Sequence, residues 1–128
     1  MAIITLHRER LRYNYERLNY FFNTKDIQWS VVTKLLCGNE LFLREVLALK
    51  PQQVCDSRVS NLKAIKKINP SIETLYIKPT PKRSVKSVVK YADISMNTEI
   101  NTIKALSEEA LKQGKIHKII ILLNWVSR

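Results

Sequence analysis

Lys34 has both the chemistry and the placement for a covalent role. Residues 27–33 alternate in polarity, with Ile27, Trp29 and Val31 on one face, which predicts a strand that ends at Lys34. An amine at the carboxyl end of a strand is fixed by a rigid scaffold and partly desolvated, so it can anchor an aldehyde cofactor. An ordinary solvated lysine also suits this position, and the strand pattern alone favours that interpretation.

Polar residues also follow the later expected strands. They are Asp56, Ser57 and Arg58, then Lys78, then Asn97 and Glu99, and finally Asn124. Several have a purely structural interpretation: Ser57 and Asn97 can cap helices, Asp56 can pair with Arg58, and Lys78 can be solvated. Capping is the favoured role of Ser57.

The cysteines and histidines do not predict a metal site. Cys37 and Cys55 make neither a metal-binding set nor a disulfide framework, so we expect both to be reduced, small buried residues. His7 and His117 are isolated in the sequence. We therefore expect no metal cofactor.

Composition predicts one globular domain. The chain has 128 residues, of which 45% are hydrophobic and 26% charged, values typical of a folded domain with a sizeable core. No apolar run approaches the roughly 18 residues of a membrane helix, and residues 1–6 are too short for a signal peptide. The expected location is the cytoplasm, without a membrane partner.

The net charge of +11 is unusual and favours anionic partners such as phosphorylated small molecules, nucleic acid or an acidic membrane surface. The basic residues are dispersed along the chain, however, and no zinc-finger, RRM or KH signature accompanies them. Nucleic acid is therefore an unlikely partner.

Strand and helix patterns alternate along the chain. A short strand is expected at residues 2–5, followed by a helix over 6–22 whose buried stripe consists of Leu11, Tyr15, Leu18 and Phe22. Further strands are expected at 27–34, 53–56, 73–77, 93–97 and 119–123, and helices between them at 39–49, 57–68, 84–90 and 98–112. Asn39, Ser57 and Thr98 are expected N-caps, and Gly114 suits the left-handed position after the last helix.

This alternation predicts an α/β fold with a parallel sheet and helices outside it. Five strands are counted from the Lys34 strand onward, and the last, Ile119 to Leu123, is continuously apolar, as in a strand buried on both faces. A closed eight-stranded barrel takes about 250 residues, so the units could form part of a barrel or a smaller open sheet. In either fold the carboxyl ends of the strands line the functional face.

Four segments resemble the pyridoxal phosphate (PLP)-dependent amino-acid racemases with an alanine-racemase-type barrel, most closely the ornithine or alanine/ornithine branch. They are residues 31–38 (VVTKLLCG), 55–63 (CDSRVSNLK), 91–99 (YADISMNTE) and 114–118 (GKIHK). The resemblance covers nearly the whole chain and implies a partial TIM-type (β/α) barrel. It also implies that Lys34 is both the covalent cofactor-binding residue and a catalytic acid/base group acting on a small amino-acid substrate.

The sequence departs from the family in two places. Leu35, Leu36, Cys37 and Gly38 follow the lysine, where alanine racemases proper have a tyrosine, and residues 124–128 (NWVSR) replace an expected acidic residue and Gly-Asp-Leu-Arg-like turn. The resemblance therefore implies that residues 1–128 are an amino-terminal part of the barrel domain, with about five of its eight strands and without its β domain. Such a chain is expected to be inactive alone and to form a homodimer or associate through its open barrel edge.

Two alternatives stay open. A non-catalytic PLP-binding barrel protein of the cofactor-homeostasis kind would bind the cofactor without turning over an amino acid. A basic nucleic-acid-binding module, the less favoured alternative, would bind with a steep salt dependence that Lys34→Ala leaves unchanged.

Overall fold

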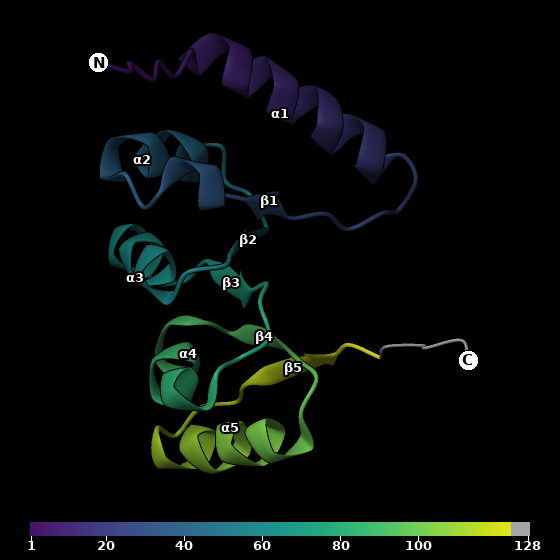
Figure 1. Ribbon diagram of the computed structural model, residues 1–128. Helices are drawn as coiled ribbons and strands as arrows, with labels where there is room; N and C mark the ends of the chain where they lie inside the picture. The colour runs from purple at the N-terminus through teal and green to yellow at the C-terminus, as the bar shows by residue number, and fades with distance from the viewer. Residues whose placement is uncertain (124–128) are drawn as a thin grey trace, which may run out of the picture.

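The computed structural model describes residues 1–123, and its centre is a parallel sheet of five strands in the order β1-β2-β3-β4-β5 (Figure 1). Every neighbouring pair of strands is parallel. The strands are β1 (Val31–Val32), β2 (Gln53–Asp56), β3 (Glu73–Tyr76), β4 (Ile94–Asn97) and β5 (Lys118–Ile121).

A helix connects each strand to the next. These helices are α2 (Glu40–Ala48), α3 (Val59–Ile68), α4 (Val85–Tyr91) and α5 (Ile100–Lys112), with short 3₁₀ turns η1 (Lys34–Leu36) and η2 (Lys82–Ser84). Figure 1 shows α2 to α5 along one side of the strands, while α1 (Arg8–Asn23) lies beside α2 and β1 at the amino-terminal end of the sheet. A strand order that never reverses, with helices on one side, is the winding of a barrel and not of a doubly wound sheet. The predicted partial barrel is confirmed.

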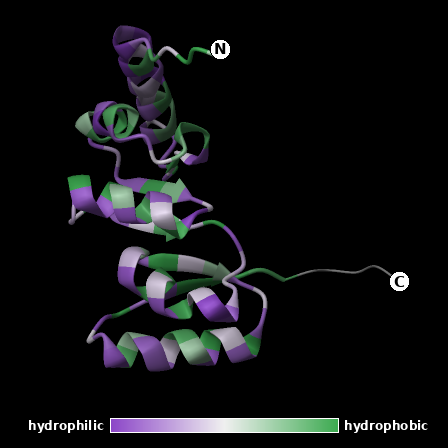
Figure 2. Cartoon of the chain, turned by 60° about the vertical axis from the view of Figure 1, so that its left-hand side comes forward, coloured by the Kyte–Doolittle hydropathy of each residue, from purple (hydrophilic) through white to green (hydrophobic). Residues whose placement is uncertain are grey.

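The core lies between the sheet and these helices. Leu43, Val54, Leu62, Ile65 and Val88 are fully buried there. Each helix carries both hydrophobic and hydrophilic segments in Figure 2, as expected of helices with one face on a sheet. The sheet is therefore held firmly on its helical side.

The opposite face of the sheet is polar at the amino ends of the strands. Strand alternation places Gln53 and Glu73 on the face away from Val54 and Thr74. Gln53 Nε2 donates to Glu73 Oε1 at 2.7 Å, and Lys118 Nζ from β5 reaches Glu73 Oε2 at 2.8 Å. This network lies at the other end of the strands from Lys34.

Several element predictions are wrong because the expected elements lack neighbours. Residues 2–5 form no strand in the described chain, since no strand lies beside them to complete a hydrogen-bonded ladder, and Ile3 is 83% exposed. The predicted strand at 27–34 shortens to Val31–Val32, the residues that pair with β2.

Two predictions of burial are also wrong. α1 has no buried residue and Leu18 is 47% exposed, since the helix packs chiefly through Tyr15 and Phe22 on Trp29. β5 is exposed along its length because it pairs only with β4 in the described chain. A continuous apolar run is typical of a strand covered on both faces, as in a closed barrel, whereas β5 is an exposed edge strand among the described strands.

The expected caps have mixed outcomes. Asn39 caps α2 by accepting from the Phe42 amide at 3.2 Å, and Gly114 follows α5 with φ of 63°, both as predicted. Ser57 and Thr98 are not N-caps: the N-cap residues are Arg58 and Glu99, without a side-chain cap bond. Cys55 is buried as expected, whereas Cys37 is exposed because it lies in the turn after Lys34.

Candidate functional site

Lys34 lies at the carboxyl edge of the sheet, in the turn that joins β1 to α2. It begins η1, its side chain is exposed, and within residues 1–123 it forms no ion pair. The turn closes through the Leu36 amide, 2.8 Å from Thr33 O, and the Cys37 amide, 3.2 Å from Lys34 O. The amine is therefore accessible on a hydrogen-bonded turn.

The turn uses an uncommon backbone conformation. Cys37 and Gly38 are both left-handed, with φ of 50° and 74°. Glycine adopts this conformation freely, but for cysteine it costs free energy that the surrounding contacts must offset. The path of the chain after Lys34 is therefore imposed by its neighbours.

A buried carboxylate at the end of β2 supports the start of the turn. Asp56 is fully buried, and its Oδ2 accepts from Thr33 Oγ1 at 2.9 Å. Its Oδ1 accepts from the Arg58 amide at 2.9 Å and from Asn61 Nδ2 at 3.0 Å. Three donors satisfy a carboxylate that would otherwise be costly to bury.

Asn61 also supports the end of the turn. A Cβ added at Gly38 would lie 2.8 Å from Asn61 Oδ1, so the glycine backbone packs directly against this amide. Asn61 is buried on α3, and the same side chain donates to Asp56. Asp56 and Asn61 thus join the two ends of the Lys34 turn to β2 and α3.

A second polar network lies at β4 and the segment before β5. Ser95 Oγ lies 2.8 Å from His117 Nε2, and His117 Nδ1 lies 3.1 Å from the carbonyl oxygen of Ala92. Since only a protonated Nδ1 can donate to that carbonyl, Nε2 of the neutral ring accepts from Ser95. Burial lowers the pKa of His117, against a smaller raising effect of the Ala92 carbonyl, and so favours this neutral ring.

The same network orients Asn97 at the carboxyl end of β4. Its Nδ2 donates to the Ser95 carbonyl at 3.1 Å and to Ser95 Oγ at 3.0 Å. Asn97 is buried, and its Oδ1 has no hydrogen-bond partner within residues 1–123. A buried acceptor is thereby left at the edge of the sheet that carries Lys34.

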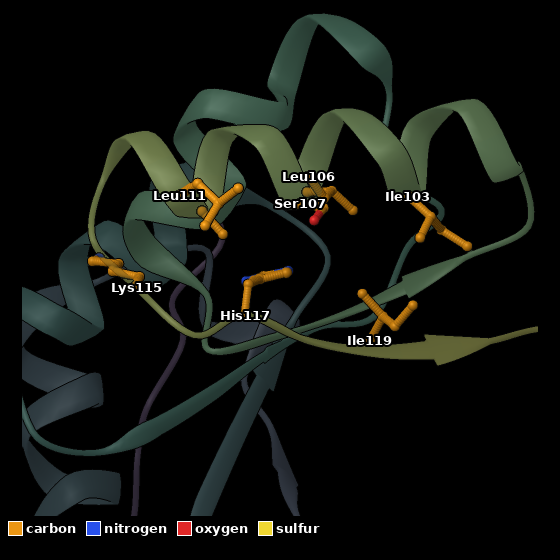
Figure 3. A pocket seen from close by; sticks show the side chains of 8 residues that line it. Ile103, Leu106, Ser107, Leu111, Lys115, His117 and Ile119 are labelled. Carbon is orange, nitrogen blue, oxygen red and sulfur yellow. The ribbon is translucent and has the colours of Figure 1, made fainter.

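His117 borders a hollow between α5 and β5. The hollow has a volume of about 320 Å³, and its walls are mainly apolar side chains such as Leu106, Leu111 and Ile119. Figure 3 shows His117 pointing toward α5, with Lys115 at one end of the hollow and Ile103 at the other. The hollow lies on the helical side of the edge strand, away from the Lys34 turn.

The structure brings together some of the polar residues predicted at strand ends. The predicted pairing of Asp56 with the Arg58 side chain is wrong: within residues 1–123 Asp56 forms no ion pair, and it accepts from the Arg58 main-chain amide and from the side chains of Thr33 and Asn61. Lys78 and Glu99 are exposed. Asn124 lies outside the described residues.

Sequence reasoning missed Thr33, Asn61 and the Ser95–His117 pair. The available signal for Asn61 was its position five residues after Asp56. The first turn of a helix that follows a strand can bring a side chain back to the end of that strand. No signal joined His117 to Ser95, since 22 residues separate them.

No cluster of three or more potential metal-binding side chains occurs in the part of the chain that the structure describes, and none of the helices there is long and apolar enough to cross a membrane. No family model matches the chain.

The chain is 33% identical over 121 residues to the ornithine racemase of Acetoanaerobium sticklandii, a match that covers 94% of this chain and 34% of that enzyme. The chain thus spans about a third of the length of this curated relative. Among solved structures, PipY of Synechococcus elongatus PCC7942, determined without PLP, matches with a TM-score of 0.72 at 17% identity. This match covers 88% of the chain and 54% of PipY.

These comparisons confirm the resemblance seen in the sequence. The PipY match shows the shared barrel-type fold, and the sequence match extends along nearly the whole chain. The chain is therefore similar in sequence to an ornithine racemase and has the fold of PipY over the strands described here.

Proposed function

We propose that Lys34 binds pyridoxal 5'-phosphate covalently and serves as one acid/base group of an amino-acid racemase of the alanine/ornithine type. The observation that carries this proposal is the position of Lys34: an exposed amine at the carboxyl edge of a barrel-type sheet, in a chain similar to an ornithine racemase. The functional residues of such barrels lie at this edge.

The residues present fit the cofactor by their chemistry. Lys34 supplies a primary amine that no ion pair holds within residues 1–123, and the turn that bears it is anchored to β2 and α3. The net charge of +11 favours the cofactor phosphate and the substrate carboxylate. PLP supplies an electron sink that makes the α-proton of an attached amino acid acidic.

Lys34 has two tasks under this proposal. Its amine holds the cofactor at the edge of β1, and it takes or returns a proton on one face of the substrate's α-carbon. Racemisation requires a second acid/base group on the opposite face. Because the chain spans 34% of the matched racemase, we propose that complete racemisation depends on parts of the enzyme beyond these strands.

Exchange of the α-proton tests this division of tasks. The purified chain is incubated in D₂O with PLP and either ornithine or alanine, and both deuterium content and chirality are followed. We expect Lys34-dependent deuterium uptake with retention of configuration, and Lys34→Ala should show only the uptake caused by free PLP. Racemisation at an ordinary enzyme rate would contradict the proposed dependence on other strands.

A non-catalytic PLP-binding barrel is the second candidate. The fold shared with PipY, whose structure was determined without PLP, is compatible with this candidate. Such a protein would attach PLP at Lys34 and yet produce no Lys34-dependent deuterium uptake. The exchange experiment therefore separates the two candidates.

A further inference from the structure

We infer that Thr33, Asp56 and Asn61 form a positioning clamp that holds the turn of Lys34, and that this clamp sets the reactivity of the Lys34 amine toward an aldehyde. The inference rests on the proposed function for its meaning, because it assigns the residues that present the amine to the cofactor. The contacts of the clamp lie within this chain and can be tested without a cofactor.

The clamp acts first on the residue before Lys34. The Thr33 amide, just after β1, donates to the Cys55 carbonyl of β2 at 2.9 Å. The Thr33 hydroxyl lies 2.9 Å from Asp56 Oδ2 and 3.3 Å from the Cys55 carbonyl, so the carboxylate is the nearer acceptor. A side chain and a main-chain amide therefore fix the point from which the turn departs.

The clamp acts again five residues later, at Gly38. Gly38 packs on Asn61 so closely that any Cβ would collide with its Oδ1 at 2.8 Å. The Asn61 amide keeps this orientation because its Nδ2 donates to Asp56 Oδ1 at 3.0 Å. One carboxylate thus holds both ends of the turn, through Thr33 on one side and Asn61 on the other.

The backbone between these two points needs such support. Cys37 is held left-handed with φ of 50°, a conformation that persists in non-glycine residues when the surroundings impose it. Without the clamp, the turn can relax and Lys34 can sample other directions. A flexible lysine loses the fixed orientation that favours attachment of a bound aldehyde.

The chain offers a matched control for the central contact. Thr33 and Thr74 are both buried threonines in or beside strands, 1% and 0% exposed, and both bond to a carboxylate. On β3, Thr74 Oγ1 donates to the Tyr91 carbonyl at 2.8 Å and lies 3.1 Å from Oδ2 of Asp93, the residue before β4. Thr74→Val therefore removes comparable chemistry away from the Lys34 turn.

The experiment compares Thr33→Val, Thr33→Ser and Thr74→Val in the 128-residue chain. Each variant is mixed with PLP and borohydride, and the rate of labelling at Lys34 is measured by peptide mapping. Loss of one hydrogen bond to a charged group predicts about tenfold slower labelling in Thr33→Val. Thr33→Ser retains the hydroxyl and should restore the rate, while Thr74→Val should stay within about twofold of the wild type.

Two results would overturn the clamp. The first is labelling of Lys34 at the wild-type rate in Thr33→Val. The second is a Thr74→Val variant whose Lys34 is labelled as slowly as that of Thr33→Val. Should Thr33→Val fail to fold, Gly38→Ala provides the second test, because its Cβ displaces Asn61 at the other end of the turn. It should slow labelling similarly, and an unchanged rate would also overturn the inference.

Amide exchange separates failure of the clamp from failure of the proposed function. If Lys34 of the wild type is labelled no faster than the exposed Lys78, the PLP proposal is wrong. The clamp is then decided by hydrogen exchange at the Leu36 and Cys37 amides, whose bonds close the turn. Faster exchange in Thr33→Val but not in Thr74→Val supports the clamp, and equal exchange in both variants contradicts it.

Discussion

The hydroxyl of Ser95 lies 2.8 Å from Nε2 of His117, which joins β4 to the segment that leads into β5. With Nδ1 donating to the Ala92 carbonyl, the neutral ring accepts from the Ser95 hydroxyl at Nε2, whereas a protonated ring would donate from Nε2 to Ser95 Oγ. The contact also orders Asn97 through the shared Ser95 hydroxyl. Protonation of His117 would therefore exchange donor and acceptor in the contact that joins β4 to the segment before β5.

Stability should decrease as the pH falls below the pKa of histidine in the unfolded chain. The pKa of His117 is lowered chiefly by burial, with Lys115 lowering it further, against raising effects of the Ala92 carbonyl and Asp93. The unfolded chain consequently binds more protons than the folded chain below about pH 6.5, and unfolding becomes easier there. Urea denaturation at pH 7.5 and pH 5 measures this difference.

His117→Gln is the control for the pH effect. It should flatten the dependence of stability on pH in this window, whatever its own effect on stability at neutral pH. Asp93 does not titrate in this window. Burial raises its pKa, but hydrogen bonds from Lys66 and Thr74 outweigh burial and lower it below the usual 3.8, so the stability that Asp93 contributes is lost only at lower pH. An unchanged slope in His117→Gln would show that another group titrates.

Packing of α3 on the sheet should dominate stability. Leu62 is fully buried in the core, so Leu62→Ala should cost about 3 kcal/mol in the free energy of unfolding through lost contacts and a cavity. Leu111→Ala, at a side chain that is 80% exposed, should change it by less than about 0.5 kcal/mol. Chemical denaturation of both variants tests this order, and similar losses would contradict the described core.

The edge strand should promote self-association. β5 pairs only with β4 among the described strands, and its Ile121 is 55% exposed. A charge on an exposed apolar edge opposes pairing with another chain, so Ile121→Lys should lower the apparent mass at high concentration. Sedimentation at several concentrations measures this effect. Leu111→Lys places the same charge on exposed α5, and an equal decrease there would argue against β5 as the contact.

The sequence predicted the alternation of strands and helices because parallel strands and helices have different hydrophobic periods. The alternation of five strands with helices and the position of Lys34 near a strand end follow from that pattern. Periodicity did not separate a partial barrel from a smaller open sheet, and the family resemblance implied the barrel. Periodicity could not predict that β5 is exposed, because an apolar strand has the same sequence whether or not a neighbour covers it. The strand expected at residues 2–5 was wrong for the same reason.

The candidate site was predictable only in part. The family resemblance predicts Lys34 as a site residue, although its strand pattern alone favoured a solvated lysine, whereas the residues that support its turn could not be predicted. Thr33 and Asn61 act through side-chain geometry between β1, β2 and α3, and the distance between Asn61 and Gly38 depends on how α3 packs. Such contacts between elements leave no period in the sequence.

Reductive trapping with mass mapping tests the central claim most directly. The purified chain is incubated with substoichiometric and then stoichiometric PLP, reduced with borohydride, digested and mapped, with Lys34→Ala and Lys78→Ala as paired controls. We predict one label per chain on Lys34, retained in Lys78→Ala and lost in Lys34→Ala. Labels scattered over many lysines, with the same pattern in Lys34→Ala, would contradict the assignment of Lys34 as the cofactor-binding residue.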